Sequence, residues 1–149
     1  MRERAGARPI WNAALDRLAL AFARFITGEG LAPKRAAAAR RLREACMAEP
    51  FLVAGTDRFC TDVMTRLSGR VFVKTGAEGV YCAGFPELGL GVALKCDDGG
   101  TRASETMMAA VIEAFVAMSP TERDGLAHRL SPPIENRKGA VVGAVRPVA

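Results

Sequence analysis

The 149-residue sequence lacks the features that mark several classes of protein. No apolar run approaches the roughly 20 residues that a membrane-spanning helix needs. The first eight residues are charged and lead into no apolar signal-peptide core. Only one histidine, one tryptophan and one tyrosine are present, which argues against a His-dependent triad and against nucleic-acid binding by stacked aromatics. We therefore expect a soluble, cytoplasmic protein without membrane or nucleic-acid partners.

The four cysteines do not form a Cys-x-x-Cys pair, since they lie 14, 22 and 14 residues apart at Cys46, Cys60, Cys82 and Cys96. This spacing argues against a zinc ribbon or a redox dithiol. The prediction is four free thiols that pack as small apolar side chains, with neither a metal site nor a cofactor in this chain. Two disulfides are conceivable only for an exported protein.

Composition indicates one globular domain over residues 1–149, because half of the chain is hydrophobic and the length suits one core. Residues 1–8 are expected to be flexible. The net charge of +5 is concentrated in residues 1–50, which carry ten Lys and Arg against five Asp and Glu. A nucleic-acid patch and the solvated face of a helix both fit this excess. We favour the solvated helix face, because no RNA- or DNA-binding motif accompanies the charge.

The apolar periodicity predicts an α+β protein in which helices pack on an antiparallel sheet. Helices are expected over 11–26, 33–47, about 59–67 and 101–118, followed by a weaker helix to 128. Strands are expected over 70–74, 80–85 and 90–95 as a meander, with a last strand over 139–145. The helix 101–118 is apolar around most of its circumference, and such a helix is normally covered on more than one side. Uncovered apolar surface would favour a homo-oligomer.

A Lys-Thr-Gly sequence ends the first expected strand, within residues 71–80. The same arrangement is the third motif of serine hydrolases with the penicillin-recognising fold. There, Lys74 would supply positive charge beside a serine nucleophile and an anionic substrate, and the hydroxyl of Thr75 would contact a substrate carboxylate. Gly76 would allow close backbone approach, and the N–H of Ala77 would form half of an oxyanion hole. A surface lysine beside an ordinary turn is the alternative interpretation.

The wider pattern resembles the bacterial L-asparaginase II family, from about Pro9 onward. The matching segments are Lys74–Val80, Gly89–Lys95, Asp98-Gly99 and Arg102-Ala103, with residues 54–64 upstream and 136–139, 142–143 and 146–147 downstream. This resemblance implies a partial β-lactamase/glutaminase-like α/β sandwich. It also implies an amidohydrolase that converts L-asparagine and water into L-aspartate and ammonia.

The resemblance covers the carboxy-terminal half of the family, whose members are roughly twice as long. Their amino-terminal half carries a Ser-x-x-Lys nucleophile pair and the zinc ligands. No Ser, Thr or Cys in this sequence has a Lys three residues later. The resemblance therefore implies a truncated chain, inactive alone, that supplies Lys74 to a site completed by another half. The zinc ligands are not expected at the four cysteines.

Supporting roles are expected for Glu78 and, less specifically, for Arg58, Lys95, Asp98 and Arg102. Glu78 would orient Lys74 or bind turn amides. Lys95 and Asp98 would form a polar pair near the site, although a strand-end lysine and a capping aspartate fit equally well. The arginines would bind a substrate carboxylate or pair with neighbouring aspartates.

Two other functions remain open at this point. One is a β-lactamase- or glutaminase-like hydrolase fragment. The other is a non-catalytic partner subunit of a split enzyme.

Overall fold

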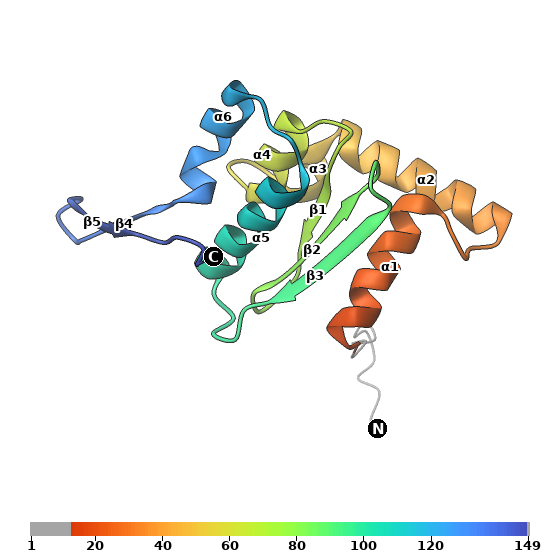
Figure 1. Cartoon of the computed structure of the whole chain (residues 1–149), viewed down its shortest axis with the longest axis horizontal. Helices are drawn as coiled ribbons and strands as arrows, with labels where there is room; N and C mark the ends of the chain where they lie inside the picture. The colour runs from red at the N-terminus through yellow and green to blue at the C-terminus, as the bar shows by residue number, and fades with distance from the viewer. Residues whose placement is uncertain (1–12, 149) are drawn as a thin grey trace.

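The computed structural model describes residues 13–148, and the expectations for residues 1–8, Pro9 and Trp11 lie outside them. A three-stranded antiparallel sheet stands between helices on both faces (Figure 1). The helices are α1 (Leu15–Thr27), α2 (Pro33–Ala48), α3 (Pro50–Ala54), α4 (Phe59–Arg66), α5 (Thr101–Phe115) and α6 (Pro120–Leu130). The strands are β1 (Phe72–Thr75), β2 (Val80–Phe85), β3 (Leu90–Lys95), β4 (Pro133–Glu135) and β5 (Val141–Ala144). The predicted α+β class is confirmed.

The main sheet is a meander in the order β1-β2-β3, as predicted. Its register pairs Lys74 with Cys82 and Val80 with Lys95. The carboxyl ends of β1 and β3 therefore lie at the same end of the sheet, one on each side of β2. β4 and β5 form a separate two-stranded hairpin that extends away from the body (Figure 1). β4, which Pro133 begins, was not among the predicted strands.

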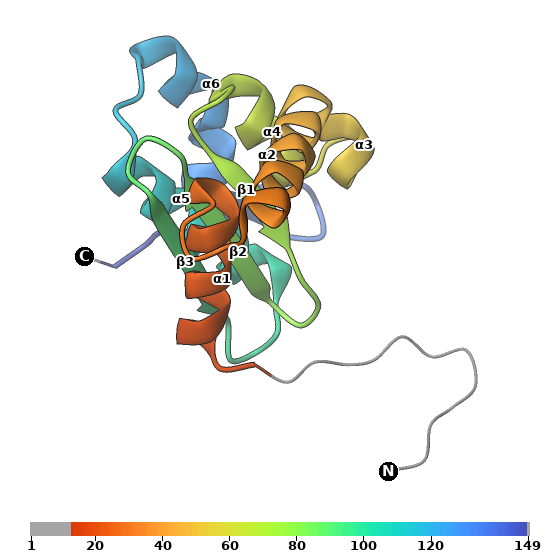
Figure 2. The same ribbon diagram turned by 90° about the vertical axis from the view of Figure 1, so that its right-hand side faces the viewer.

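Side-chain alternation along β2 separates two layers of helices. Tyr81 packs edge-on against Phe59 of α4, and Phe85 packs against Phe115 of α5. Gly84, which faces the opposite way, lies against Ile26 of α1. Figure 2 shows the same separation, with α1 in front of the sheet and α5 behind it. All six residues of β2 are therefore covered to some degree, and five of them are buried.

A pair of glycines allows α1 to lie directly on the sheet. Gly84 and Gly91 are cross-strand partners in β2 and β3. A Cβ on Gly91 would overlap the backbone of Ala19 and Ala23, and a Cβ on Gly84 would overlap the side chain of Ile26. Beside this contact, Phe72 of β1 packs against Phe22 and Phe25 of α1, with ring centroids 6.0 and 5.3 Å apart.

The short helix α3 was not among the predicted helices, and Pro50 opens it because proline fits the first turn. The N-caps of α4 and α5 are Arg58 and Gly100, neither of which uses a side chain as a cap. α6 is better formed than expected, because Ser119 and Glu122 make a reciprocal capping box.

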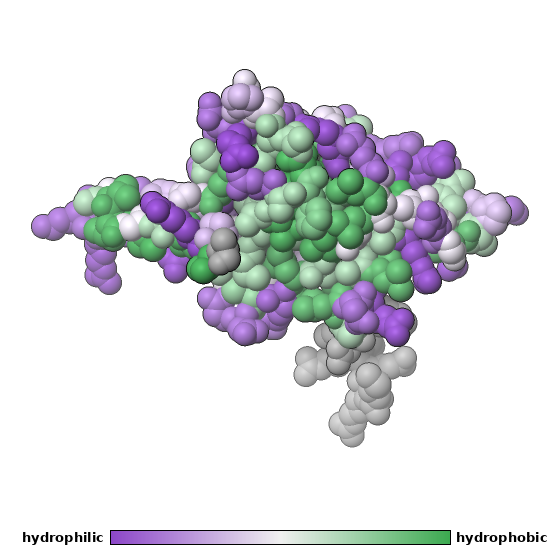
Figure 3. All heavy atoms as spheres, viewed as in Figure 1, coloured by the Kyte–Doolittle hydropathy of each residue, from purple (hydrophilic) through white to green (hydrophobic). Residues whose placement is uncertain are grey.

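The helix expected over 101–118 ends at Phe115. Met108 and Ile112 are buried in the core, whereas Met107 and Phe115 are 42% and 47% exposed. The described chain thus leaves part of α5 uncovered. Apolar side chains gather on the face shown in Figure 3, over β3 and between α5 and α1. Within residues 13–148, none of the helices combines the length and hydropathy that crossing a membrane requires.

The contact between α1 and the glycine pair predicts that Gly91→Ala destabilises the fold. The added Cβ would force α1 away from the sheet, at a cost of about 2–3 kcal/mol in the free energy of unfolding. Gly143→Ala in β5 is the matched control, since its Cβ would come no closer than 3.7 Å to Ile134. Urea denaturation followed by circular dichroism measures both. Equal midpoints for the two variants would show that the close approach contributes nothing.

Candidate functional site

Two turns pack against each other at one end of the main sheet. The first, residues 76–79, joins β1 to β2, and the second, residues 96–100, joins β3 to α5. The Cys96 N–H donates to the Gly79 carbonyl at 3.0 Å. Gly79 has a φ of 71°, and a Cβ on it would lie 2.9 Å from the Cβ of Cys96. Glycine is therefore required here both by the backbone conformation and by the closeness of the second turn.

Two lysines extend from the same sheet face at this end. Lys74 is two residues after Phe72, and Lys95 is four residues after Gly91, so alternation places both on the α1 side. The Lys74 Nζ donates to the Thr75 carbonyl at 2.9 Å, and the Lys95 Nζ donates to the Cys96 carbonyl at 2.6 Å. Within residues 13–148, neither ammonium has a carboxylate partner within 4.0 Å. The α1 face at this end of the sheet thus presents two ammonium groups that can attract an anionic ligand.

The residues after Lys74 present backbone groups rather than a packed cluster of side chains. Thr75 alternates to the face opposite Lys74, and its hydroxyl donates to the Gly76 carbonyl at 3.2 Å. The Gly76 N–H donates to the Val80 carbonyl at 2.7 Å. Ala77 is an exposed residue, and its N–H donates no hydrogen bond within the described part of the chain. It is therefore available to a ligand.

Glu78 is exposed and forms no ion pair with Lys74 in the described chain. Its φ of 53° belongs to the left-handed region, which non-glycine residues rarely adopt. Such strain occurs often in turns that present functional groups. The backbone of Glu78 packs beside Gly99 of the second turn.

Asp98 acts as the organiser of the second turn. Its Oδ1 accepts from the Cys96 thiol at 2.9 Å and from the Gly100 N–H at 2.7 Å. These bonds, the thiol first, hold the pKa of Asp98 below its ordinary value. Asp98 and Lys95 form no ion pair, and Asp98 holds the turn through these two bonds instead. Arg58 and Arg102 lie at the starts of α4 and α5, and both are exposed without an ion pair among residues 13–148.

Cys60 of α4 is the reactive side chain that the structure brings closest to this motif. Its thiol receives a hydrogen bond from the Thr75 N–H and feels the charge of Lys74. Burial outweighs both effects and raises the pKa of the thiol. Cys60 is only 1% exposed, so it is both protonated and out of reach of a substrate.

The predicted free thiols are confirmed, since no disulfide links the four cysteines. Burial also raises the pKa of Cys82, to about 11. Within the described residues, no three His, Cys, Asp or Glu side chains gather closely enough to hold a metal ion. The cysteines therefore act as packing residues.

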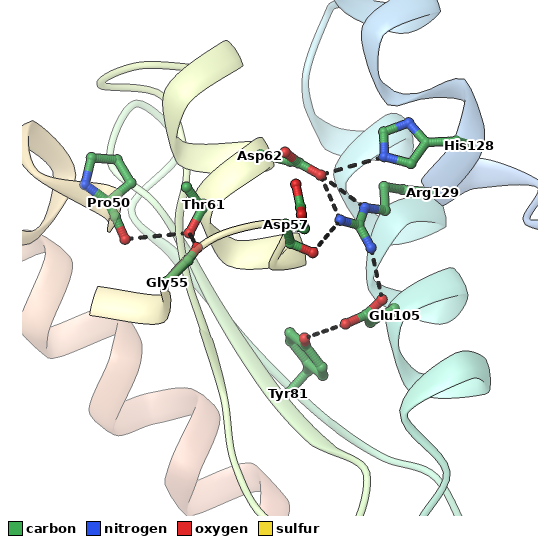
Figure 4. Close-up of polar contacts among 9 residues, drawn as sticks. All are labelled: Pro50, Gly55, Asp57, Thr61, Asp62, Tyr81, Glu105, His128 and Arg129. Atoms are coloured by element: carbon green, nitrogen blue, oxygen red, sulfur yellow. Dashed lines mark hydrogen bonds and ion pairs between the residues drawn. The ribbon is translucent and has the colours of Figure 1, made fainter. Parts of the chain in front are cut away.

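A polar cluster behind the sheet, the Arg129 cluster, consists of Asp62, Tyr81, Glu105, His128 and Arg129 (Figure 4). Arg129 of α6 donates to Asp62 of α4 at 2.7 and 2.9 Å, and it lies 3.4 Å from Glu105 of α5. The Tyr81 hydroxyl donates to Glu105 at 3.1 Å. The cluster thereby ties three helices to the central strand.

The Arg129 cluster was not predicted from the sequence. Its members come from four elements, and Arg129 is 67 residues from Asp62. His128 is exposed, as expected, and its Nε2 lies 3.4 Å from Asp62. Burial raises the pKa of Tyr81, so its hydroxyl keeps its proton and remains a donor to Glu105. A structural role explains every contact in the cluster.

A family model described as L-asparaginase II matches residues 7–147, which is nearly the whole chain. A search of the curated proteins finds no match.

The Arg129 cluster predicts that Arg129→Ala lowers stability. The change leaves Asp62 and Glu105, whose side chains are 25% and 17% exposed, without their common cation. We expect a loss of about 2 kcal/mol in the free energy of unfolding, since both carboxylates are partly screened by water. Arg123→Ala is the control, because its ion pair with Glu113 lies at the surface and should contribute about 0.5 kcal/mol. Urea denaturation compares the two, and an equal loss would contradict a role for Arg129 in joining the helices.

Proposed function

Because the chain belongs to the L-asparaginase II family, we propose that it forms one wall of an amide-hydrolysing active site. The reaction is the hydrolysis of the side-chain amide of L-asparagine to L-aspartate and ammonia. Another polypeptide segment supplies the serine nucleophile. The observation that carries this proposal is the position of Lys74 at the end of β1, on the same sheet face and at the same sheet end as Lys95, and without a carboxylate partner among residues 13–148.

The charge at this end of the sheet suits the substrate. Asparagine carries an α-carboxylate, and its amide oxygen gains negative charge as a nucleophile attacks. Lys74 stabilises charge near the nucleophile, and Lys95 adds to the positive field that attracts the carboxylate. Fixed charges next to reacting atoms stabilise a transition state more strongly in a water-excluded site than the same charges do in water.

Backbone donors provide the second element of the site. Ala77 is an exposed residue whose N–H has no acceptor in the described chain, so this N–H is free to donate to the developing oxyanion. The glycine at position 76 keeps the approach to this amide open. Thr75 contacts the substrate carboxylate from the strand edge, and Glu78 fixes the shape of the turn. Arg58, Asp98 and Arg102 support the site from the neighbouring loops.

The nucleophile is the missing element. The buried serine, Ser104, donates to the Thr101 carbonyl, and Ser119 caps α6. Cys60 is buried with a raised pKa. We therefore assign the nucleophile to a complementing amino-terminal half with a Ser-x-x-Lys pair, and we propose that this chain is inactive alone. The free cysteines favour a reducing compartment and hence a cytoplasmic location.

Ammonia release from L-asparagine tests this proposal. The purified chain alone should release no more ammonia than the Lys74→Ala variant. Adding the amino-terminal half of a longer family member should create asparaginase activity. In that mixture Lys74→Ala should lower kcat by about a hundredfold or more, whereas Lys138→Ala in the distant hairpin should leave it unchanged.

The outcomes separate the alternatives. Turnover by the chain alone that depends on Lys74 would contradict the assignment of the nucleophile to another segment. Cleavage of a chromogenic β-lactam or of glutamine, but not of asparagine, would favour the β-lactamase- or glutaminase-like hydrolase. A stable complex without any hydrolase activity would favour the non-catalytic partner subunit.

A further inference from the structure

A groove runs between α1 and α2, the two helices that lie side by side in front of the sheet in Figure 2. Its volume is about 470 Å³. The walls include Leu20 and Ala21 of α1 and Ala39 of α2, and three arginines border it: Arg17, Arg24 and Arg35. Because the alanine side chains are small, a ligand in the groove can approach the backbones of both helices closely. The groove thus combines an apolar floor with a positively charged rim.

The rim arginines are short of acidic partners. Arg24 and Arg35 have no carboxylate within 4.0 Å among residues 13–148. Arg17 lies 3.6 Å from Asp16, but both side chains are about three-quarters exposed, so this pair contributes little. Lys34 and Arg41 of α2 are also exposed, but they do not line the groove. The groove therefore attracts a ligand with several negative charges.

The arginines are spaced like the charges along a helix. Arg17 and Arg24 are seven residues apart on α1, which corresponds to about 10 Å along the helix axis. Acidic residues seven positions apart on another helix have the same spacing. A ligand with one carboxylate, such as a fatty acid, would use only one of the three arginines.

We propose that the α1/α2 groove binds an acidic amphipathic helix from a separate polypeptide. The apolar face of that helix packs on Leu20, Ala21 and Ala39, and its flanking carboxylates pair with Arg17, Arg24 and Arg35. Helices bind in apolar grooves in this way, with anchors three and four residues apart. This inference goes beyond the amide-hydrolysing site, because it uses neither Lys74 nor the turn that follows it.

A second copy of this chain is a poor occupant. None of the helices in the described chain carries more than two acidic residues. The two on α5 are Glu105 and Glu113, which already pair with Arg129 and Arg123, and the two on α6 are Glu122, which pairs with Arg70, and Asp124. The net charge of +5 also makes two copies repel each other. A partner with acidic helices avoids both costs.

The test uses a synthetic helical peptide of about three heptads, with leucines on one face and glutamates flanking them. Fluorescence anisotropy measures its binding to the purified chain. Arg17→Gln/Arg24→Gln/Arg35→Gln should weaken binding by about tenfold or more. Lys34→Gln/Arg41→Gln, at the two α2 residues that do not line the groove, is the matched control and should change binding less than twofold, within about 0.4 kcal/mol. Unchanged thermal midpoints establish that all variants fold.

The same peptide with glutamine in place of glutamate should bind about tenfold more weakly. Lys74→Ala should bind the acidic peptide normally, so a failed asparaginase proposal leaves this one standing. The proposal is overturned if the peptide does not bind, or if the triple variant and the control bind it equally. It is also overturned if dodecanoate or duplex DNA binds the groove arginines more tightly than the peptide, or if the chain self-associates through them.

Discussion

The close approach of α1 to the sheet at Gly84 and Gly91 determines the arrangement of the rest of the molecule. Because neither residue has a Cβ, α1 crosses β2 and β3 at backbone distance. This contact places α1 on the sheet face to which strand alternation directs Lys74 and Lys95. α1 also forms one wall of the α1/α2 groove. Any side chain at these two positions would move the helix that both proposed sites depend on.

The two faces of the sheet differ in the polar contacts that their side chains make. On the α4 and α5 side, the Arg129 cluster holds three helices to Tyr81 through partly buried ion pairs and hydrogen bonds. On the α1 side, Lys74 and Lys95 bond only to neighbouring carbonyls. Charges that are satisfied by carboxylates stabilise a fold, whereas unpaired ammoniums are free for a ligand. The division explains why the conspicuous ion pairs lie away from the candidate site.

The candidate site is a meeting of two turns rather than an enclosed cavity. The turn after β1 supplies a strained Glu78 and a free Ala77 amide, and the turn after β3 supports it through Cys96, Asp98 and Gly99. Such a surface orients groups but provides no nucleophile. The α1/α2 groove is a second open surface, bordered by Arg24 and Arg35, which have no ion pair among residues 13–148, and by Arg17, whose pair with Asp16 is exposed. Both surfaces are suited to partners outside the described residues.

The sequence by itself determined the α+β class, the three-stranded meander and the Lys-Thr-Gly motif with its family, because local periodicity and short motifs are encoded between near neighbours. It did not reveal that Pro50 opens a helix or that Pro133 begins a strand, and it left open whether Asp98 pairs with Lys95 or binds groups in its own turn. Only the tertiary structure decided these points. It also brought Asp62, Glu105 and Arg129 together and opened the groove between α1 and α2. Contacts between residues far apart in the chain depend on how helices pack, and no local pattern records that packing.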